Sequence, residues 1–343
     1  MKGIILHGGH GTRLRPLTHT GPKQLLKIAN KPMSQYALED LRDAAITDIA
    51  IIIGDVHPEK VKEFYGDGTQ FGVKITYVFQ DHPKGIAHAI GLCKEFVGKE
   101  KFVVYLGDNI LRKGLKSYVS NFSTSDDSAL ILLSEVSNPS QFGIAKIENN
   151  TLIQIIEKPK SPPSNLAVIG VYFLTPEIFP IIDNLKPSWR NELEITEALQ
   201  ELISVKNPPT FDYVGGWWKD TGTPEDVLHA NQLILETLVK DDVDHMQIGQ
   251  GSKINPSAKI TGPILIGKNC SIGESAVIGP NVSIGDNSNL NECHIKNSII
   301  MDDCEINSKI IIEDSIISDG TKITGDFSNK FSMLLGERSK IKF

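Results

Sequence analysis

The residues best suited to chemistry stand close together near the N-terminus, directly after a short apolar run. Three glycines within four residues are followed by a threonine, an arginine and, ten residues later, a lysine. These residues are Gly8, Gly9, Gly11, Thr12, Arg13 and Lys23. Glycine lets backbone N–H groups turn inward and approach a ligand closely, so such a loop can hold an anion. A planar guanidinium and a compact ammonium beyond the loop suit a polyphosphate.

Two common phosphate-binding motifs are missing from this loop. The pattern G-x-x-x-x-G-K-[ST] does not occur, and Leu14 stands where G-x-G-x-x-G needs its last glycine. This argues against a P-loop kinase and a nicotinamide enzyme. The string GGHGTRLRPLT, followed by PKQLLKIANKPM, instead resembles the signature of sugar-1-phosphate nucleotidylyltransferases. The resemblance implies that a nucleotide passes from a nucleoside triphosphate to a sugar 1-phosphate and that pyrophosphate leaves.

Such a reaction needs positioned charge more than an acid or a base, because the attacking phosphate oxygen is already ionised. Mg²⁺ prefers one or two carboxylates together with phosphate oxygens and water. Asp108 follows the apolar run FVVYL, and Asp220 stands in the string GGWWKDTGTPED. Each alone is typical of a turn or a helix cap. Together they resemble the magnesium ligands of the family, so we expect Mg²⁺ as the cofactor.

The resemblance also implies which residues hold the nucleotide. Arg13 would stabilise the leaving pyrophosphate, and Lys23 would neutralise the α-phosphate. An amide offers one donor and one acceptor, which matches the N3–H and O4 edge of a pyrimidine. The predicted nucleotide-binding residues are Leu6, Gly8, Gly9, Gly11, Thr12, Gln24, Gln80, Gly85 and Gly107.

A second group of residues is expected around the sugar phosphate. Lys158, in the string EKP, resembles the lysine that orients the attacking phosphate, and Glu157 would take sugar hydroxyls. Val168, Gly170 and Tyr172 alternate on one face of a strand and line the same pocket, although a core strand explains Val168 equally well. The predicted set is Gly143, Glu157, Lys158, Val168, Gly170, Tyr172 and Glu192, with Glu194 as the alternative to Glu192.

The string KPSWRNELEITEALQ (186–200) resembles the glucose-1-phosphate thymidylyltransferases in particular, in their longer form that ends in a β-helix. Transfer from UTP or GTP to another sugar stays open, because thymine and uracil differ only by a methyl group. A non-catalytic assembly subunit of the same layout is a further alternative, but it would not need to keep the cationic and acidic residues. His10 stands where the family usually has a smaller residue in the loop. His88 is expected to serve in the packing of a helix.

The elements that must position these residues alternate between apolar runs and helical patterns up to about residue 235. This predicts a Rossmann-like α/β domain with a mostly parallel mixed sheet, whose ligands bind at the carboxyl ends of the strands. Strands are predicted at Lys2–Leu6, Asp48–Ile53, Lys74–Phe79, Phe102–Leu106 and Ala129–Ser134. Helices are predicted at Ser34–Ala45, Pro58–Phe64, Gly85–Phe96 and Lys113–Phe122.

Three further elements are predicted before the chain changes character. The stretch 142–159 indicates a hairpin that turns at Glu148, Asn149 and Asn150, and VIGVYFL (168–174) indicates another strand. Thr223 followed by Pro224 is typical of a helix start, and that helix is expected to run to about Val239. The charged stretch 240–245 is the predicted linker.

Beyond the linker, apolar residues recur every sixth position. They are Ile248, Ile254, Ile260, Ile266, Ile272, Ile278, Ile284 and Leu290, and the period resumes at Ile300, Ile306 and Ile312 after a slip. One short strand and one turn per six residues predict a left-handed parallel β-helix of hexapeptide repeats. We therefore expect a catalytic domain at 1–240, a β-helix at 246–325 and a tail at 326–343.

Composition bounds what the protein can bind. The chain has 343 residues and a net charge of −7, which argues against nucleic acid and anionic membrane as partners. No signal peptide or stretch of 18 apolar residues is seen, so a cytoplasmic protein is expected. The four cysteines (Cys93, Cys270, Cys293 and Cys304) lack metal-type spacing and indicate buried thiols. The flat faces of the β-helix predict a homo-oligomer.

Overall fold

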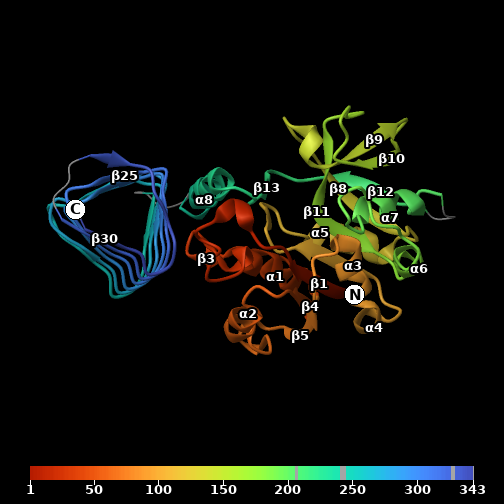
Figure 1. The fold of residues 1–343 in the computed structure, drawn as a ribbon, viewed down its shortest axis with the longest axis horizontal. Coiled ribbons are helices and arrows are strands. Elements are labelled where there is room, and N and C mark those ends of the chain that lie inside the picture. The colour runs from red at the N-terminus through yellow and green to blue at the C-terminus, as the bar shows by residue number, and fades with distance from the viewer. Residues whose placement is uncertain (205–207, 240–244, 326–328, 343) are drawn as a thin grey trace. The chain divides into compact units, whose positions relative to one another are not determined.

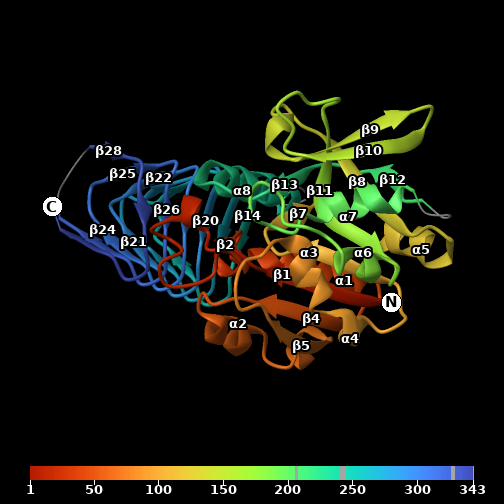
Figure 2. The ribbon, with the colours of Figure 1, turned by 45° about the vertical axis from the view of Figure 1, so that its right-hand side comes forward.

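The computed structural model describes residues 1–204, 208–239, 245–325 and 329–342. The chain forms two compact units, which are residues 1–9 with 34–220, and residues 10–33 with 221–343. Figures 1 and 2 show the elements of both units. Residues 240–244 of the predicted linker lie outside the described residues. The predicted domain boundaries remain a prediction.

The first unit is built on a mostly parallel mixed sheet, which confirms the predicted fold class. Its main order is β10-β9-β11-β6-β1-β4-β5, and β8 joins β11 to β12. Strand β1 is parallel to β4 and β6, β4 is parallel to β5, and β11 runs antiparallel to β6 and β8. The strands are β1 (Lys2–His7), β4 (Asp48–Ile53), β5 (Lys74–Phe79), β6 (Phe102–Leu106), β8 (Ala129–Glu135), β9 (Gly143–Glu148), β10 (Thr151–Glu157), β11 (Leu166–Leu174) and β12 (Thr210–Tyr213). A separate pair is formed by β7 (Asn109–Leu111) and β13 (Trp218–Asp220).

The predicted helices are present, with small shifts at their ends and two larger differences. The stretch expected as one helix at Gly85–Phe96 forms two short helices. The first ends at Gly91, and the second begins at Lys94. The helix expected from Lys113 begins at Lys116, after Gly114 takes a left-handed φ of 61°. The helices are α1 (Met33–Asp43), α2 (Pro58–Tyr65), α3 (Ile86–Gly91), α4 (Lys94–Val97), α5 (Lys116–Thr124), α6 (Ile178–Ile182), α7 (Ile195–Leu202) and α8 (Pro224–Leu238). Short 3₁₀ turns lie at Thr12–Leu14, Lys23–Leu25, Thr69–Phe71 and Pro139–Gln141.

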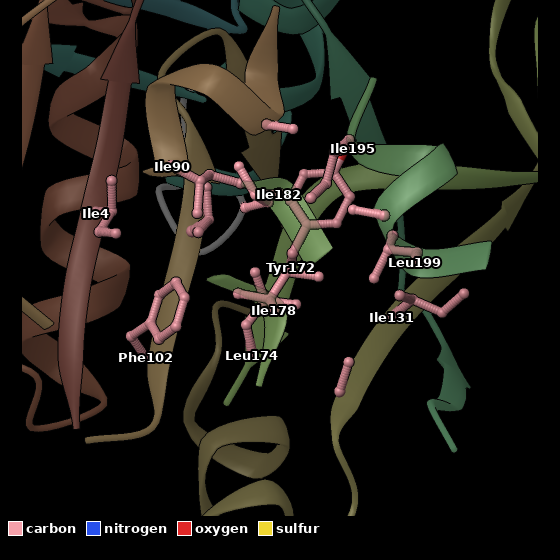
Figure 3. Close-up of a cluster of buried hydrophobic side chains, with 14 of the residues drawn as sticks. Ile4, Ile90, Phe102, Ile131, Tyr172, Leu174, Ile178, Ile182, Ile195 and Leu199 are labelled. Atoms are coloured by element: carbon pink, nitrogen blue, oxygen red, sulfur yellow. The ribbon is translucent and has the colours of Figure 1, made fainter. Parts of the chain in front are cut away.

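The core of the first unit lies between one face of the sheet and helices α3, α6 and α7 (Figure 3). Alternate strand residues such as Ile4, Phe102 and Tyr172 point into this core, as the two-residue period of a strand requires. The hairpin β9–β10 turns at Asn149 and Asn150, which both have positive φ, as a tight two-residue turn needs. In the first unit, the candidate residues Leu6, Gly143, Glu157, Val168, Gly170 and Tyr172 stand on strands of this packed sheet.

The C-terminal repeats coil into three parallel sheets, so the predicted β-helix is present (Figure 1). The first sheet contains β14 (Met246–Ile248), β17 (Ile264–Ile266), β20 (Val282–Ile284), β23 (Ile299–Ile300), β26 (Ile316–Ile317) and β29 (Leu334–Leu335). The second contains β15 (Lys253–Ile254), β18 (Ser271–Ile272), β21 (Asn289–Asn291), β24 (Glu305–Asn307), β27 (Lys322–Thr324) and β30 (Lys340–Lys342). The third contains β16 (Lys259–Ile260), β19 (Val277–Ile278), β22 (His294–Lys296), β25 (Ile311–Glu313) and β28 (Lys330–Phe331).

The slip in the six-residue period is absorbed without breaking the stack. Ile295 takes the place opposite Ile278, and Ile300 stands opposite Ile284. Three short strands, β28 to β30, continue the sheets through the stretch predicted as a tail. Buried apolar side chains fill the interior of the coils, so the period in the sequence is the period of this core.

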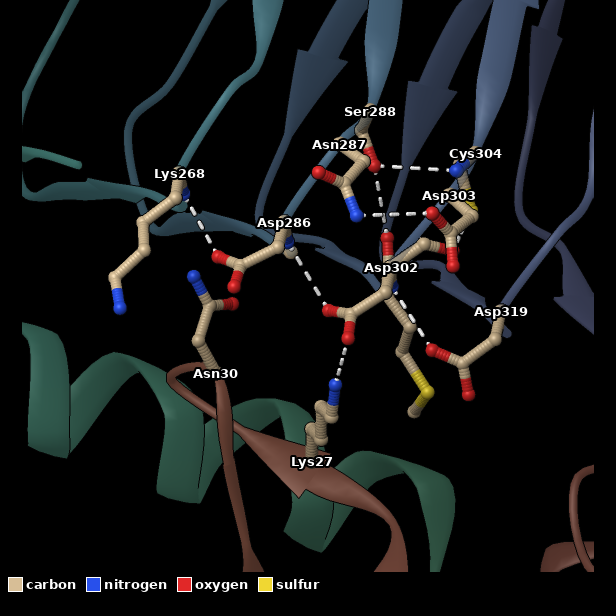
Figure 4. Close-up of polar contacts among 12 residues, drawn as sticks. Lys27, Asn30, Lys268, Asp286, Asn287, Ser288, Asp302, Asp303, Cys304 and Asp319 are labelled. Atoms are coloured by element: carbon tan, nitrogen blue, oxygen red, sulfur yellow. Dashed lines mark hydrogen bonds and ion pairs between the residues drawn. The ribbon is translucent and has the colours of Figure 1, made fainter. Parts of the chain in front are cut away.

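Residues 10–33 belong to the second unit and pack against its coils. They include the hairpin β2 (Lys27–Ile28) and β3 (Lys31–Pro32). Lys27 forms an ion pair with Asp302 (Figure 4). Nδ2 of Asn30 donates to the Ile284 carbonyl at 2.6 Å. Asn231 of α8 accepts from the Ala29 N–H and from the Ser283 hydroxyl, both at 2.9 Å. The hairpin, α8 and the β-helix are thus joined by direct polar contacts.

The buried state of the cysteines agrees with the expectation from their spacing. All four cysteines are buried and none forms a disulfide. Burial raises the pKa of Cys93, Cys293 and Cys304 to about 12. None of the helices in the described ranges combines the length and the apolar character that crossing a membrane would take.

Candidate active site

The first unit brings several predicted residues to one edge of its sheet. Strands β1, β5 and β6 point the same way, so their carboxyl ends meet at one edge. Gly8, Gln80 and Asp108 stand at or just beyond these three ends. The Gly107 N–H donates to the Leu6 carbonyl at 3.0 Å, which ties the turn before Asp108 to the end of β1.

The two aspartates predicted as metal ligands lie near each other in this unit. Asp220 ends β13 and pairs with Asn109, the residue directly after Asp108. Both aspartates also act on the hydroxyl of Tyr172. Burial raises the pKa of Tyr172, and four carboxylates raise it further. They belong to Glu157, Asp108, Asp220 and Glu194. The predicted metal and sugar residues therefore share one region of negative charge.

Asn109 is an organising residue that the sequence analysis did not identify. It is 2% exposed, and its Nδ2 donates to Oδ1 of Asp108 at 3.0 Å. Its own Oδ1 accepts from the Gly170 N–H at 3.2 Å and from the Trp218 indole at 2.6 Å. A Cβ at Gly170 would lie 2.7 Å from this amide. Gly170 thus leaves the room that Asn109 needs to hold Asp108.

His7, the last residue of β1, is also close to this charge. Burial lowers the pKa of His7 to about 3, although the Asp108 carboxylate acts in the opposite direction. The imidazole is therefore neutral at physiological pH and adds no positive charge beside Gly8.

The predicted base-binding residues form a tight turn in the same unit. Gln80 is 5% exposed, and its side chain points towards Gly8, where a Cβ would lie 3.7 Å from Oε1. Gly85 has a φ of 103°, and a Cβ there would lie 2.4 Å from the Leu193 carbonyl oxygen. Only glycine fits at this position, because both the φ and the space exclude a side chain.

A network of charges surrounds Glu157 in the predicted sugar site. Arg190 contacts Oε1 of Glu157 at 3.5 Å, and the Thr196 hydroxyl donates to Oε2 at 3.0 Å. Burial and the Glu194 carboxylate raise the pKa of Glu157, against the effect of Thr196, Lys158 and Arg190. A Cβ at Gly143 would meet Thr196 at 2.5 Å. Arg190 and Thr196 are further members that the sequence analysis did not single out, although both stand in the string 186–200 that carries the family resemblance.

The remaining predicted sugar residues divide between exposed and buried positions. Lys158 has a positive φ of 40° and its Nζ lies 3.8 Å from Glu157, with a partly exposed side chain. Backbone strain of this kind concentrates at functional sites. Glu192 bonds to Arg190 at 3.0 Å. Val168 and Tyr172 are buried on β11, and the pairing with β8 shifts between them.

The second unit holds the other part of the predicted phosphate loop. Gly11 has a φ of 58°, and a Cβ there would lie 2.9 Å from Thr18 and 3.2 Å from the Cβ of Lys23. The Arg13 guanidinium lies so close to Gly222 that a Cβ would be 2.7 Å from Nη2. Thr12 is exposed, and Gln24 is buried beside Lys23 in a 3₁₀ turn. In this unit the structure brings Gly11 and Lys23 together.

Asp108 and Asp220 fit a magnesium ion whose remaining ligands would be phosphate oxygens of the substrates and water. Asp108 and Asp220 supply two oxygen-donor side chains, and Asn109 fixes one of them. Among the described residues, no three or more His, Cys, Asp or Glu gather as metal ligands. Mg²⁺ commonly takes one or two carboxylates and completes its shell with phosphate oxygens and water, so a pair suits it.

The chain is similar to known sugar nucleotidyltransferases over its whole length. Residues 2–237 match the nucleotidyl transferase family, and residues 260–342 match the GMPPB C-terminal domain. The low-salt glycan biosynthesis nucleotidyltransferase Agl11 of Haloferax volcanii is 46% identical over 356 aligned positions, which cover 100% of both chains. A glucose-1-phosphate thymidylyltransferase of Streptomyces antibioticus is 39% identical, with 100% of this chain and 99% of that protein covered.

Solved structures resemble about two thirds of this chain. A Bacillus anthracis protein described as a candidate glucose-1-phosphate thymidylyltransferase, in complex with sucrose, is 44% identical with a TM-score of 0.65. It covers 68% of this chain and 94% of its own. A UDP-glucose pyrophosphorylase in complex with UDP-glucose is 30% identical with a TM-score of 0.61, covering 69% of this chain and 98% of its own.

Proposed function

This chain belongs to the nucleotidyl transferase family, and on that premise we propose that it transfers a thymidylyl group from dTTP to glucose 1-phosphate. The products are dTDP-glucose and pyrophosphate. The coarser activity, that of a sugar-1-phosphate nucleotidyltransferase, follows from the family and from relatives that match over the full chain. The choice of base and sugar is the part that we propose.

The observation that carries the choice of a base with a hydrogen on N3, which thymine and uracil share, is the orientation of Gln80. Its Oε1 faces Gly8 at the carboxyl edge of the sheet, as a hydrogen-bond acceptor. Thymine presents N3–H to such an acceptor, and the Gly85 backbone N–H adds a donor for a carbonyl oxygen of the base. In this proposal Leu6, Gly8, Gly9 and Gly107 lie along the nucleotide, and Gln24 adds a second amide.

Glucose 1-phosphate is assigned to the residues around Glu157. Glu157 accepts hydrogen bonds from sugar hydroxyls, and Gly143 leaves space beside it. Lys158 binds the phosphate and points its oxygen at the α-phosphorus of dTTP. The other members of the sugar site are Val168, Gly170, Tyr172 and Glu192.

Transfer itself is a substitution at phosphorus. The ionised oxygen of glucose 1-phosphate forms a bond to the α-phosphorus, and the bond to the bridging oxygen breaks, so pyrophosphate leaves with that electron pair. Lys23 neutralises charge on the α-phosphate, while Arg13, Gly11 and Thr12 bind the leaving pyrophosphate. Asp108 and Asp220 would hold Mg²⁺, which would supply further neutralisation of phosphate charge when bound.

UTP is the second candidate nucleotide. An acceptor at Gln80 fits uracil as well as thymine, because both present N3–H, and one similar structure holds UDP-glucose.

The flat sheets of the β-helix also support self-association, which light scattering of the purified protein measures directly.

The test is pyrophosphate release over a grid of substrates. The four triphosphates are dTTP, UTP, GTP and ATP, each with glucose 1-phosphate, N-acetylglucosamine 1-phosphate and mannose 1-phosphate, with and without Mg²⁺. We expect the highest kcat/KM for dTTP with glucose 1-phosphate and no turnover without Mg²⁺. A clear preference for a purine triphosphate overturns the assignment of the base.

A further inference from the structure

His88 contacts the amide of Gln80 from helix α3. Nε2 of Gln80 lies 2.8 Å from Nδ1 of His88 and 3.5 Å from the Gly85 carbonyl oxygen. The Gln80 backbone is also fixed, because its N–H donates to the Ile53 carbonyl at 2.9 Å. Both described hydrogen bonds of the side chain therefore use the same end of the amide.

The Gly85 carbonyl identifies which atom of the amide faces His88. A carbonyl oxygen can only accept a hydrogen bond, so the atom that faces it must be the amide nitrogen. That nitrogen then donates to Nδ1 of His88 as well. Nδ1 is an acceptor, and the ring proton stands on Nε2. The neutral form is favoured, since burial and the nearby Lys84 lower the pKa of His88 against the effect of Asp81.

This arrangement leaves Oε1 of Gln80 pointing towards Gly8 as an acceptor. The polarity matters, because pyrimidines differ at N3. Thymine and uracil carry a hydrogen there and need an acceptor, whereas cytosine has a bare nitrogen and needs a donor. If the amide turned over, Nε2 would face the base, and the site would fit cytosine instead.

We propose that His88 is a specificity-determining positioning residue, which holds Gln80 so that the enzyme accepts thymine or uracil and rejects cytosine. The inference rests on the proposed function, because it needs a pyrimidine beside Gln80. It differs from simple helix packing, in which any side chain of similar shape would serve at position 88.

The test compares kcat/KM for dTTP, UTP and dCTP, with glucose 1-phosphate, in the full-length enzyme. His88→Phe keeps a ring of similar shape and removes the acceptor, and His88→Leu removes it with a smaller side chain. His88→Asn restores an acceptor near the position of Nδ1. His82→Leu is the matched control, because His82 is exposed in the same turn and its described hydrogen bond to the Asp81 carboxylate comes from its backbone N–H.

We expect His88→Phe and His88→Leu to lower the preference for dTTP over dCTP about tenfold, as the loss of one oriented hydrogen bond predicts. The KM for dTTP should rise with little change in kcat, because the contact acts on binding. His88→Asn should recover the preference. The ratio of dTTP to UTP should stay constant in every variant, since both bases present N3–H. Thermal melting checks that each variant is folded.

Two results would overturn the role of His88 alone. One is a wild-type enzyme that prefers dTTP to dCTP and keeps that preference in His88→Phe and His88→Leu. The other is a ¹⁵N NMR spectrum in which Nδ1 of His88 is protonated at neutral pH. A wild-type enzyme that prefers a purine triphosphate overturns the proposed function, and the role of His88 with it.

Discussion

At the scale of single residues, Asn109 shows how a buried amide can organise charged groups. It donates to Asp108 and accepts from Gly170 and from Trp218, so all of its described bonds lead to neighbours of the proposed metal site. A carboxylate held in this way presents its second oxygen in a fixed direction. This is the kind of support that metal ligands commonly receive from the residues behind them.

Lys23→Ala tests the assignment of positive charge to the reacting phosphate. We expect kcat to fall at least about a hundredfold, because the ammonium neutralises charge that builds up during transfer. Arg15→Ala is the control, because Arg15 is exposed in the same segment and its replacement removes an equal positive charge. Steady-state pyrophosphate release measures both. Near-normal turnover of Lys23→Ala in a folded protein removes Lys23 from the mechanism.

Glu157→Gln tests the electrostatics of the sugar site through its effect on stability. The pKa of Glu157 is raised in the folded protein from its ordinary value of 4.5. The folded state therefore binds more protons than the unfolded state just above pH 4.5, and ionisation of Glu157 costs stability as the pH rises through its folded pKa. Because glutamine does not ionise, the stability of the variant relative to wild type should increase between pH 4 and pH 7.

Urea unfolding across that range measures the effect, and Glu59→Gln provides a control of opposite sign. The pKa of Glu59 is lowered by its backbone hydrogen bond and by His57. Its ionised form therefore adds stability above its unfolded pKa, and the variant should lose stability relative to wild type as the pH rises. Parallel pH curves for the two variants would contradict this account of Glu157.

At the scale of elements, strand β11 has an irregular stretch where the Asn109 side chain contacts its backbone. Its pairing with β8 shifts between Val168 and Tyr172, and Gly170 stands within that irregular stretch. The irregularity and the missing side chain together let the Asn109 amide reach the backbone of β11.

Gly170→Ala should therefore damage catalysis more than folding. The added methyl group would lie 2.7 Å from the Asn109 amide, so Asn109 and Asp108 must move. Misplacement of about 1 Å can lower turnover on the order of 10²-fold, while overpacking costs about 1–3 kcal/mol of stability. Gly54→Ala is the control, because no atom lies within 4 Å of a Cβ there. Unchanged kcat in Gly170→Ala would contradict the role of Asn109.

How much of the fold the sequence predicts also depends on the element. The strand ends were predictable because a buried apolar run is local, and β4, β5 and β6 have the predicted bounds. The coils were predictable because each turn repeats the same core position. The break between α3 and α4 was not predictable. Both segments are apolar on one side, and neither a proline nor a pair of glycines marks the boundary.

The supporting residues of the site were harder to predict for the same reason. Asn109 gains its role from Gly170 and Trp218, which are distant in the chain, and no local pattern records such a contact. Gln80 was predictable from its place after a strand, but its orientation depends on His88 across a turn. Sequence motifs therefore predict candidate binding residues more readily than they predict the residues that hold those candidates in place.

At the scale of the whole molecule, the largest surprise is where residues 10–33 belong. They leave the sheet after Gly9 and join the unit that contains the β-helix. The ion pair between Lys27 and Asp302 links the hairpin to the coils of the β-helix (Figure 4). The bond from Asn30 to the Ile284 carbonyl is a second link.

A double-mutant cycle on Lys27→Met and Asp302→Asn measures this link. We expect a coupling energy of about 1 kcal/mol in urea unfolding, because both side chains are partly buried. The pair of Lys322 and Glu305 is the control, since it lies within the β-helix and is more exposed, and its coupling should be clearly smaller. Equal coupling energies in the two cycles would show that Lys27 stabilises the contact between the hairpin and the β-helix no more than an exposed ion pair does.

The hairpin that carries Lys27 follows Arg13 and Lys23 in one segment, and that segment packs with coils encoded at the other end of the gene. Recombination between relatives could not exchange the C-terminal repeats cleanly at a single crossover. A chimaera would need the donor's residues 10–33 as well as its repeats, so the inherited module is discontinuous in the sequence.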